Sequence, residues 1–366
     1  FIGIGISIFV AISFLFLIID QKFIIKVPPI PFYIYLLFTG LFLFSFISYY
    51  INGRFKGLLV YGALILLFMT VRLQSIYIKN IDQFLIKLVF WISLSSLFIV
   101  VLGFFVGEKF NFFRYQGFYT NANSMGMFAA FTIHIIAGVL FSYNNLSKNY
   151  KYFYYIMLFI FLILLLASNS RAALLSALVV IFLKPLIEFA KSINFLTFKI
   201  STLHMKKFFY FLFLILLFAI FFYFNGFLDN IFIKFIEKKV SGDISAGRID
   251  GWIIMMKEWS FFGHKDLKEI SDKNLVFGHN TWMGHLNYNG LLSLLFFLGW
   301  MIWMYKWAWK QLRPINKNKS VGVFIFIFTG YLINASFESA TSTPGIITSL
   351  IIFALIYKRP ILDNLH

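Results

Sequence analysis

The sequence predicts an all-α protein, a polytopic transmembrane helical bundle of about 11 spans with one long, partly helical periplasmic loop. Three observations predict this fold. Only 13% of the 366 residues are charged, whereas a soluble domain carries roughly 25%. Hydrophobic residues make up 61% of the chain, which excludes a disordered protein. Apolar runs long enough to cross about 30 Å of hydrocarbon recur along the sequence. A soluble globular enzyme is therefore excluded.

The spans are assigned in order from these apolar runs. They lie near residues 1–19, 31–50, 57–71, 84–106, 123–142, 151–167, 171–187, 207–227, 287–305, 320–338 and 345–357. All seven prolines fall in the gaps or at run ends, as expected because proline costs a helix interior about 3 kcal/mol. The division is eight spans in 1–227, the loop in 228–286 and three spans in 287–366. Eleven spans with a cytoplasmic C-terminus would leave Phe1 outside, so we expect one further helix upstream and 12 spans in the intact protein.

The basic residues give the orientation of these spans. They concentrate in alternate gaps, and the positive-inside rule places those gaps in the cytoplasm. These gaps carry Lys22, Lys26, Arg72, Lys79, Lys148, Lys151, Lys184, Lys191, Lys199, Lys206, Lys207, Lys306, Lys310, Arg313, Lys317, Lys319, Lys358 and Arg359. The C-terminus is then cytoplasmic, and the net charge of +18 is an orientation signal rather than a nucleic-acid footprint.

Polar residues that lipid does not explain collect in the opposite, outer gaps. Arg114 precedes the segment 116–123, which ends at Asn123, and Ser168 to Arg171 form a short break between two spans. The region 334–343 carries Glu338 near a helix end. Among residues inside the predicted spans, His134 is expected to make a helix–helix hydrogen bond.

The outer segment 228–286 is long, and loops of this length are usually functional or disordered. Ile249, Trp252, Ile253 and Met256 have the spacing of an amphipathic helix, which would lie on the membrane surface or cap a cavity. Arg248 falls in the first turn of that helix, where the helix dipole and the guanidinium together attract an anion.

Several short motifs occur in order on this outer face. They are Gly117 to Gly126 with Asn121 and Asn123 between, Ser168-Asn169-Ser170-Arg171, Gly247-Arg248 with Trp252, and Gly278-His279-Asn280 with Gly290. Together they resemble the signature of the bacterial O-antigen ligase and O-antigen polymerase superfamily, over roughly residues 115–295. The sequence departs from that pattern at Trp259 to Gly263, where proline often precedes the glycine, and at Asn287 or Asn289, where an acidic residue is common.

The resemblance implies a glycosyltransferase of the bacterial cytoplasmic (inner) membrane, with its active site on the periplasmic face. Its donor would be an undecaprenyl-pyrophosphate-linked oligosaccharide and its acceptor a saccharide, and a chain-length regulator is an expected partner. His279 would be the general base, and Arg171 and Arg248 would bind the pyrophosphate. Arg114, Asn123, Asn280 and Glu338 are candidate substrate-binding residues. A histidine with an ordinary pKa near 6.5 suits a general base, and arginine binds pyrophosphate oxygens in bidentate geometry.

Three functions remain open at this stage. The first is an O-antigen polymerase, which would transfer the glycan onto another lipid-linked repeat unit with inversion of configuration at the anomeric carbon. The second is an O-antigen ligase, which would transfer it to lipid A core. The third is a transporter of lipid-linked oligosaccharides, although transporters place ionisable residues near the bilayer midplane. We expect no metal and no cofactor, because no Asp-x-Asp, HExxH or P-loop motif is present. We expect membrane lipid but no nucleic acid as a partner.

Overall fold

The structure is a computed structural model that describes residues 32–53, 55–75, 78, 80–106, 110–111, 114–117, 119, 122–194, 199–200, 248–257, 259–264, 280–311, 319–337 and 344–357. Apart from short turns and connecting segments such as 259–264, these residues are helical, with two antiparallel pairs of two-residue strands. The helices are α2 (Phe32–Asn52), α3 (Phe55–Gln74), α4 (Ile81–Val106), α5 (Ala122–Ser142), α6 (Lys148–Ser168), α7 (Arg171–Ser192), α10 (Arg248–Lys257), α11 (Thr281–Gln311), α12 (Lys319–Phe337) and α13 (Pro344–Ile356). The strand pairs are β1 (Phe110–Asn111) with β2 (Arg114–Tyr115), and β3 (Ile193–Asn194) with β4 (Lys199–Ile200).

The prediction of an all-helical chain with membrane-spanning helices is confirmed for this part of the protein. Each predicted run in the described ranges coincides with a helix, and the runs 1–19 and 207–227 lie outside them. Among the described helices, α4, α5, α6, α11 and α12 are long and apolar enough to cross a membrane. Shorter apolar stretches lie within α2, α3, α7 and α13. The helix α11 begins at Thr281, so the last six residues of the predicted loop are helical.

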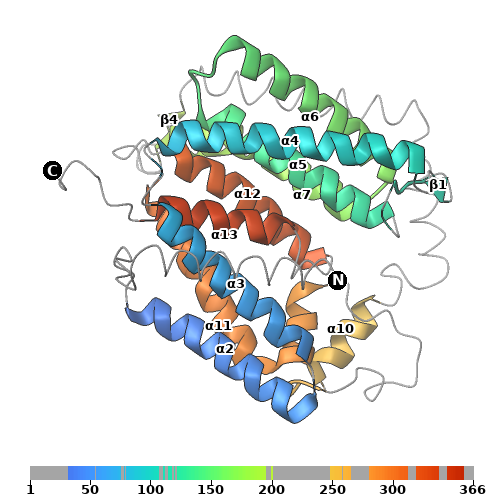
Figure 1. Ribbon diagram of the computed structural model, residues 1–366, viewed down its shortest axis with the longest axis vertical. Helices are drawn as coiled ribbons and strands as arrows, with labels where there is room; N and C mark the ends of the chain where they lie inside the picture. The colour runs from blue at the N-terminus through green and yellow to red at the C-terminus, as the bar shows by residue number, and fades with distance from the viewer. Residues whose placement is uncertain are drawn as a thin grey trace.

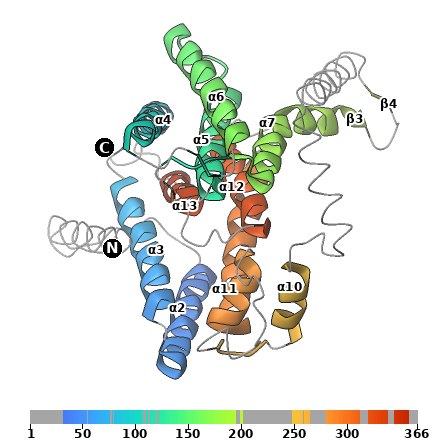
Figure 2. The same ribbon diagram turned by 90° about the vertical axis from the view of Figure 1, so that its right-hand side faces the viewer.

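The helices α12 and α13 form the middle of the bundle. Figures 1 and 2 show α4, α5, α6 and α7 on one side of them and α2, α3 and α11 on the other. Within the most apolar 18 residues of each helix, 78% of the residues are buried in α5 and 72% in α12, against 28% in α4. The pair α5–α12 is therefore the interior of the protein, and α4 has the exposed apolar surface expected of a helix that faces lipid.

Small residues set the approach of α5 to α12. A Cβ placed at Gly138 would lie 3.2 Å from the Val323 carbonyl oxygen, and one placed at Gly330 would overlap the His134 ring. Glycine at these positions lets two helix backbones approach closely, as is common between membrane helices. The two contacts also show that α5 and α12 run antiparallel, because the residue number rises on one helix as it falls on the other.

Candidate active site

A tight break between α6 and α7 positions Arg171. Asn169 ends α6 in the left-handed conformation (φ 51°, ψ 38°), and its N–H donates to the Leu166 carbonyl at 3.0 Å. The Ser168 hydroxyl donates to the Leu165 carbonyl at 2.7 Å. Asparagine tolerates the left-handed conformation better than most residues do, so the chain can turn here without glycine. The helix α7 then begins at Arg171, whose side chain is exposed at the helix end that attracts anions.

The first turns of α5 pack directly on this break. A Cβ placed at Gly126 would overlap the Cβ of Ser170 and would lie 2.6 Å from the Ser168 hydroxyl oxygen. Only glycine leaves room for such an approach. The structure therefore brings together two of the predicted motifs, 117–126 and 168–171, which are more than 40 residues apart in the sequence.

The strand pair before α5 belongs to the same end of the bundle. The backbone of Arg114 lies in β2, next to Tyr115, which is buried and stacks on Phe104 of α4 with ring centroids 4.8 Å apart. Burial raises the pKa of Tyr115, and it raises the pKa of Tyr119 to about 12. Both phenols therefore stay protonated and uncharged at neutral pH. Asn123, partly buried, lies in the first turn of α5.

The end of α12 lies beside the start of α5. From the contact of His134 with Gly330, eight residues back along α5 lead to Gly126, and seven residues forward along α12 lead to Phe337. Each step is about two helical turns, so the antiparallel register places Phe337 level with Gly126. Glu338, a candidate binding residue, follows Phe337 in the sequence but lies outside the described residues.

Asn280 joins the start of α11 to the end of α12. Its side-chain oxygen accepts the N–H groups of Trp282 (2.9 Å) and Met283 (3.1 Å), which makes it the N-cap of α11. Its side-chain nitrogen donates to the Ser336 carbonyl of α12 at 2.8 Å. The Trp282 indole N–H donates to the Ser336 hydroxyl at 3.2 Å. The structure thus gives Asn280 a structural role, and its substrate contact stays a prediction.

The short helix α10 begins at Arg248 and packs beside the first part of α11, as Figure 2 shows. The helix matches the predicted amphipathic segment, but the buried residue that anchors it is Met255, whose carbonyl oxygen is 3.4 Å from the Asn287 amide. Ile253 is 46% and Met256 52% exposed. The predicted apolar stripe therefore faces away from the bundle at these two residues, as required of a helix that lies on a membrane surface.

The helix α11 is broken at Gly290, which has φ 87° and ψ 167°. The segment 259–264 fits into the break so closely that a Cβ at Gly290 would overlap the Phe261 carbonyl. In return, a Cβ at Gly263 (φ 81°) would overlap the Tyr288 carbonyl. Two glycines of the predicted motif region are thus explained by one backbone-to-backbone contact.

Hydrogen bonds across the break replace one that α11 lacks. In a regular helix the N–H of Leu291 would bond to the carbonyl of Asn287, four residues earlier. Here Leu291 N–H donates to the Ser260 carbonyl (2.9 Å), and the Asn287 carbonyl accepts His264 N–H (2.8 Å). The Asn52 amide at the end of α2 donates to two carbonyls of the same segment, at 3.0 and 3.2 Å. The segment 259–264 is therefore held between α2 and α11, next to the end of α10.

Two buried histidines belong to polar contacts between helices. The hydroxyl of Ser176 on α7 lies 3.3 Å from His134 Nε2 on α5, which confirms the predicted helix–helix hydrogen bond. Across the break in α11, His285 Nε2 lies 3.0 Å from the Ser293 hydroxyl, which is 3.4 Å from the Ser45 hydroxyl of α2. His285 lies in the predicted loop 228–286 and was given no role, because only the earlier start of α11 at Thr281 places it inside a membrane segment.

The remaining predicted residues are only partly placed. The structure describes the backbone of Arg248 and of Arg114, whereas His279, like Glu338, lies outside the described residues. In the described ranges, no three His, Asp or Glu side chains are grouped so that they could hold a metal ion.

The sequence matches no protein-family model and no curated protein. The resemblance to the O-antigen superfamily therefore rests on the motif residues themselves.

The arrangement favours the binding of an anion. The helices α5, α7 and α11 all begin at the end of the bundle where α12 finishes, as the contacts at Gly126 and Asn280 establish. Each helix start carries a partial positive charge, and Arg171 adds a full charge beside one of them. This end of the protein can therefore attract an anion.

Proposed function

We propose that the protein is an O-antigen polymerase, or a polymerase of a related surface polysaccharide. The donor is an undecaprenyl-pyrophosphate-linked oligosaccharide, and the acceptor is a sugar hydroxyl on another lipid-linked repeat unit. The observation that carries the proposal is the gathering of motif segments 117–126, 168–171 and 280–290 at one end of the bundle. These segments are far apart in the sequence, and lipid packing gives no reason for polar residues to share one end.

The proposed reaction is a single displacement at the anomeric carbon of the donor. The acceptor oxygen forms a bond to that carbon, the bond from the carbon to the pyrophosphate oxygen breaks, and the configuration inverts. His279 takes the proton of the acceptor hydroxyl, and the lipid pyrophosphate leaves with the electron pair. Arg171 and Arg248 stabilise the charge that develops on the leaving group, so no metal is required. Arg114, Asn123, Asn280 and Glu338 orient the saccharides.

The same proposal includes the topology. About 11 spans in this chain cross the bacterial inner membrane, the C-terminus is cytoplasmic and the segment 228–286 lies in the periplasm. The exposed apolar side chains of Ile253 and Met256 support the position of α10 at the membrane surface, over the active site.

The test is a reconstituted transfer assay with purified lipid-linked oligosaccharide, without ATP or nucleotide sugar. Longer lipid-linked glycans are the expected product. Transfer only to added lipid A core would assign the protein as a ligase, and translocation without a new glycosidic bond would assign it as a transporter.

Single variants in the same assay test the proposed roles. His279→Ala should keep donor binding and lose about 10²–10⁴-fold in single-turnover rate, because a general base contacts only the attacking hydroxyl. Arg171→Ala and Arg248→Ala should weaken donor binding as well as turnover, and lysine should rescue each only in part. His264→Ala and Lys151→Ala are matched controls with expected wild-type rates. A wild-type rate in His279→Ala would contradict the proposed site.

A further inference from the structure

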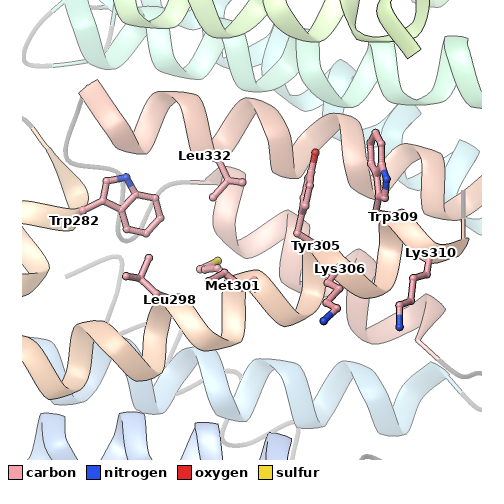
Figure 3. Close-up of a pocket in the computed structure, with 9 residues that line it drawn as sticks. Trp282, Leu298, Met301, Tyr305, Lys306, Trp309, Lys310 and Leu332 are labelled. Carbon is pink, nitrogen blue, oxygen red and sulfur yellow. The ribbon is translucent and has the colours of Figure 1, made fainter. Parts of the chain in front are cut away.

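An apolar groove of about 530 Å³ runs along α11 beside α12. Leu298 and Met301 of α11 and Leu332 of α12 line its apolar part, and Figure 3 shows their side chains converging on one space. The groove is separate from the polar contacts of Asn280, because only Trp282 at its far end belongs to that region.

The opposite end of the groove is basic. Lys306 and Lys310 are one helical turn apart and both exposed, and Figure 3 shows both amino groups on the same side of α11. In the described part of the chain, neither lysine forms an ion pair. Like charges at this spacing repel each other on a helix, so a bound anion between them would relieve an unfavourable contact.

Aromatic side chains accompany the two lysines. The rings of Tyr305 and Trp309 stack with centroids 6.1 Å apart, and Trp309 is 46% exposed. Tyrosine, tryptophan and lysine together are typical of the headgroup level of a membrane. The basic end of the groove therefore lies where a lipid phosphate would be.

The length of the groove fits one leaflet. Leu298 and Lys310 are 12 residues apart on α11, which corresponds to about 18 Å along a helix at 1.5 Å per residue. Half of a hydrocarbon core of about 30 Å is about 15 Å. A single acyl chain that starts at the lysines would therefore reach Leu298 near the middle of the bilayer.

We propose that this groove is a binding site for one anionic phospholipid of the cytoplasmic leaflet. The phosphate lies between Lys306 and Lys310, and one acyl chain lies against Leu298, Met301 and Leu332. The site requires that the protein spans a membrane with the end of α11 at the cytoplasmic face, as proposed above, and it is independent of the proposed glycosyl transfer.

The test is native mass spectrometry of the full chain with added phosphatidylglycerol, phosphatidylcholine or polyprenyl phosphate. The wild-type protein should retain one phosphatidylglycerol in preference to the other two lipids. The double variant Lys306→Gln/Lys310→Gln should bind it about 25-fold more weakly, at about fivefold per lysine. Met301→Trp, which fills the apolar part while keeping both lysines, should also reduce binding.

Lys148→Gln/Lys151→Gln is the matched control. These lysines are exposed in the first turn of α6, at the same end of the bundle as the end of α11 but outside the groove. The control should bind phosphatidylglycerol as the wild type does. An equal loss in the control would show attraction by surface charge alone and would overturn the site. Equal retention of phosphatidylcholine, or preference for polyprenyl phosphate, would overturn the assignment of the ligand.

Discussion

Asn280 shows how a polar residue at a predicted site can hold the fold. It caps α11 with its side-chain oxygen and binds α12 with its side-chain nitrogen. The sequence carried little signal for the cap, because the predicted apolar run begins only near residue 287, whereas the helix begins at Thr281. The bond to Ser336 had no signal, since the two residues are 56 positions apart.

Replacing Asn280 by alanine should destabilise the protein by about 1 kcal/mol through loss of the cap, with a further cost from the lost contact with α12. Asn280→Asp should rescue only in part, because a carboxylate restores the cap but cannot donate to the Ser336 carbonyl. The measurement is thermal unfolding in detergent. Asn145→Ala, in an exposed turn at the other end of the bundle, is the control. If Asn280→Ala keeps the wild-type melting temperature but loses transfer, ligand binding rather than capping is its main role.

His285 and Ser293 should be energetically coupled across the break in α11. Hydrogen bonds between membrane-buried side chains contribute about 0.6 kcal/mol on average. A double-mutant cycle of His285→Phe and Ser293→Ala, read by thermal unfolding, should give a coupling of this size. Phenylalanine retains the ring that stacks on Phe297, 4.9 Å away. The control pair His285→Phe and Ser176→Ala should be additive, and coupling in both pairs would argue against a specific bond.

At the scale of single elements, sequence patterns predicted the helices α10 and α11 but neither the buried face of α10 nor the break in α11. The 3.6-residue spacing predicted α10 correctly as a helix, yet Met255, outside the predicted stripe, is the residue packed on the bundle. An apolar stripe shows where a helix meets an apolar environment, but lipid and protein are both apolar. The break in α11 was also invisible in the sequence, because its partner carbonyls lie about 30 residues earlier.

Gly290→Ala and Gly263→Ala should each strongly destabilise the protein. A left-handed or otherwise positive φ costs a side-chain-bearing residue about 1–2 kcal/mol, and here the new Cβ also meets a backbone carbonyl that cannot move aside. Gly284→Ala is the matched control in the same helix, because its Cβ would lie 4.0 Å from the nearest other atom. The readout is the yield of monodisperse protein and its melting temperature. Comparable behaviour of all three variants would contradict the described packing at the break.

At the scale of the whole molecule, hydropathy predicted the apolar helices that the structure describes, whereas the orientation inferred from charge stays a prediction. The runs were found because lipid requires long apolar helices whatever their neighbours are. The location of the motif segments at one end of the bundle was predicted by counting the spans between them. The helix packing could not be predicted, because contacts such as Gly126 with Ser170 join backbones that no local pattern relates.

Cysteine labelling should establish the topology, since the chain has no native cysteine. Lys268→Cys should react with a membrane-impermeant maleimide in intact cells whose outer membrane is permeabilised. Lys199→Cys and Lys317→Cys should react only after the inner membrane is opened. Reaction of position 268 solely from the cytoplasmic side would remove the basis of the proposed active site.

Transfer activity should persist in EDTA. In the proposed mechanism, arginine side chains neutralise the leaving pyrophosphate, and no motif supplies a divalent-ion site. The measurement is the transfer rate of purified protein with and without chelator, with magnesium and manganese added back. A strict requirement for either ion would refute the metal-independent mechanism.

The contacts of α2 have a consequence for the order in which the protein assembles during synthesis. Asn52 and Ser48 of α2 bind carbonyls of residues 262, 263 and 288, more than 200 positions later in the chain. Ribosomes deliver these partners only after most of the polypeptide has been made. The helix α2 is therefore inserted in the bilayer before its partners in segment 259–264 and α11 have been synthesised. In nascent chains that stop before residue 260, α2 should pack only against α3, and its side that faces α11 should be exposed to membrane proteases.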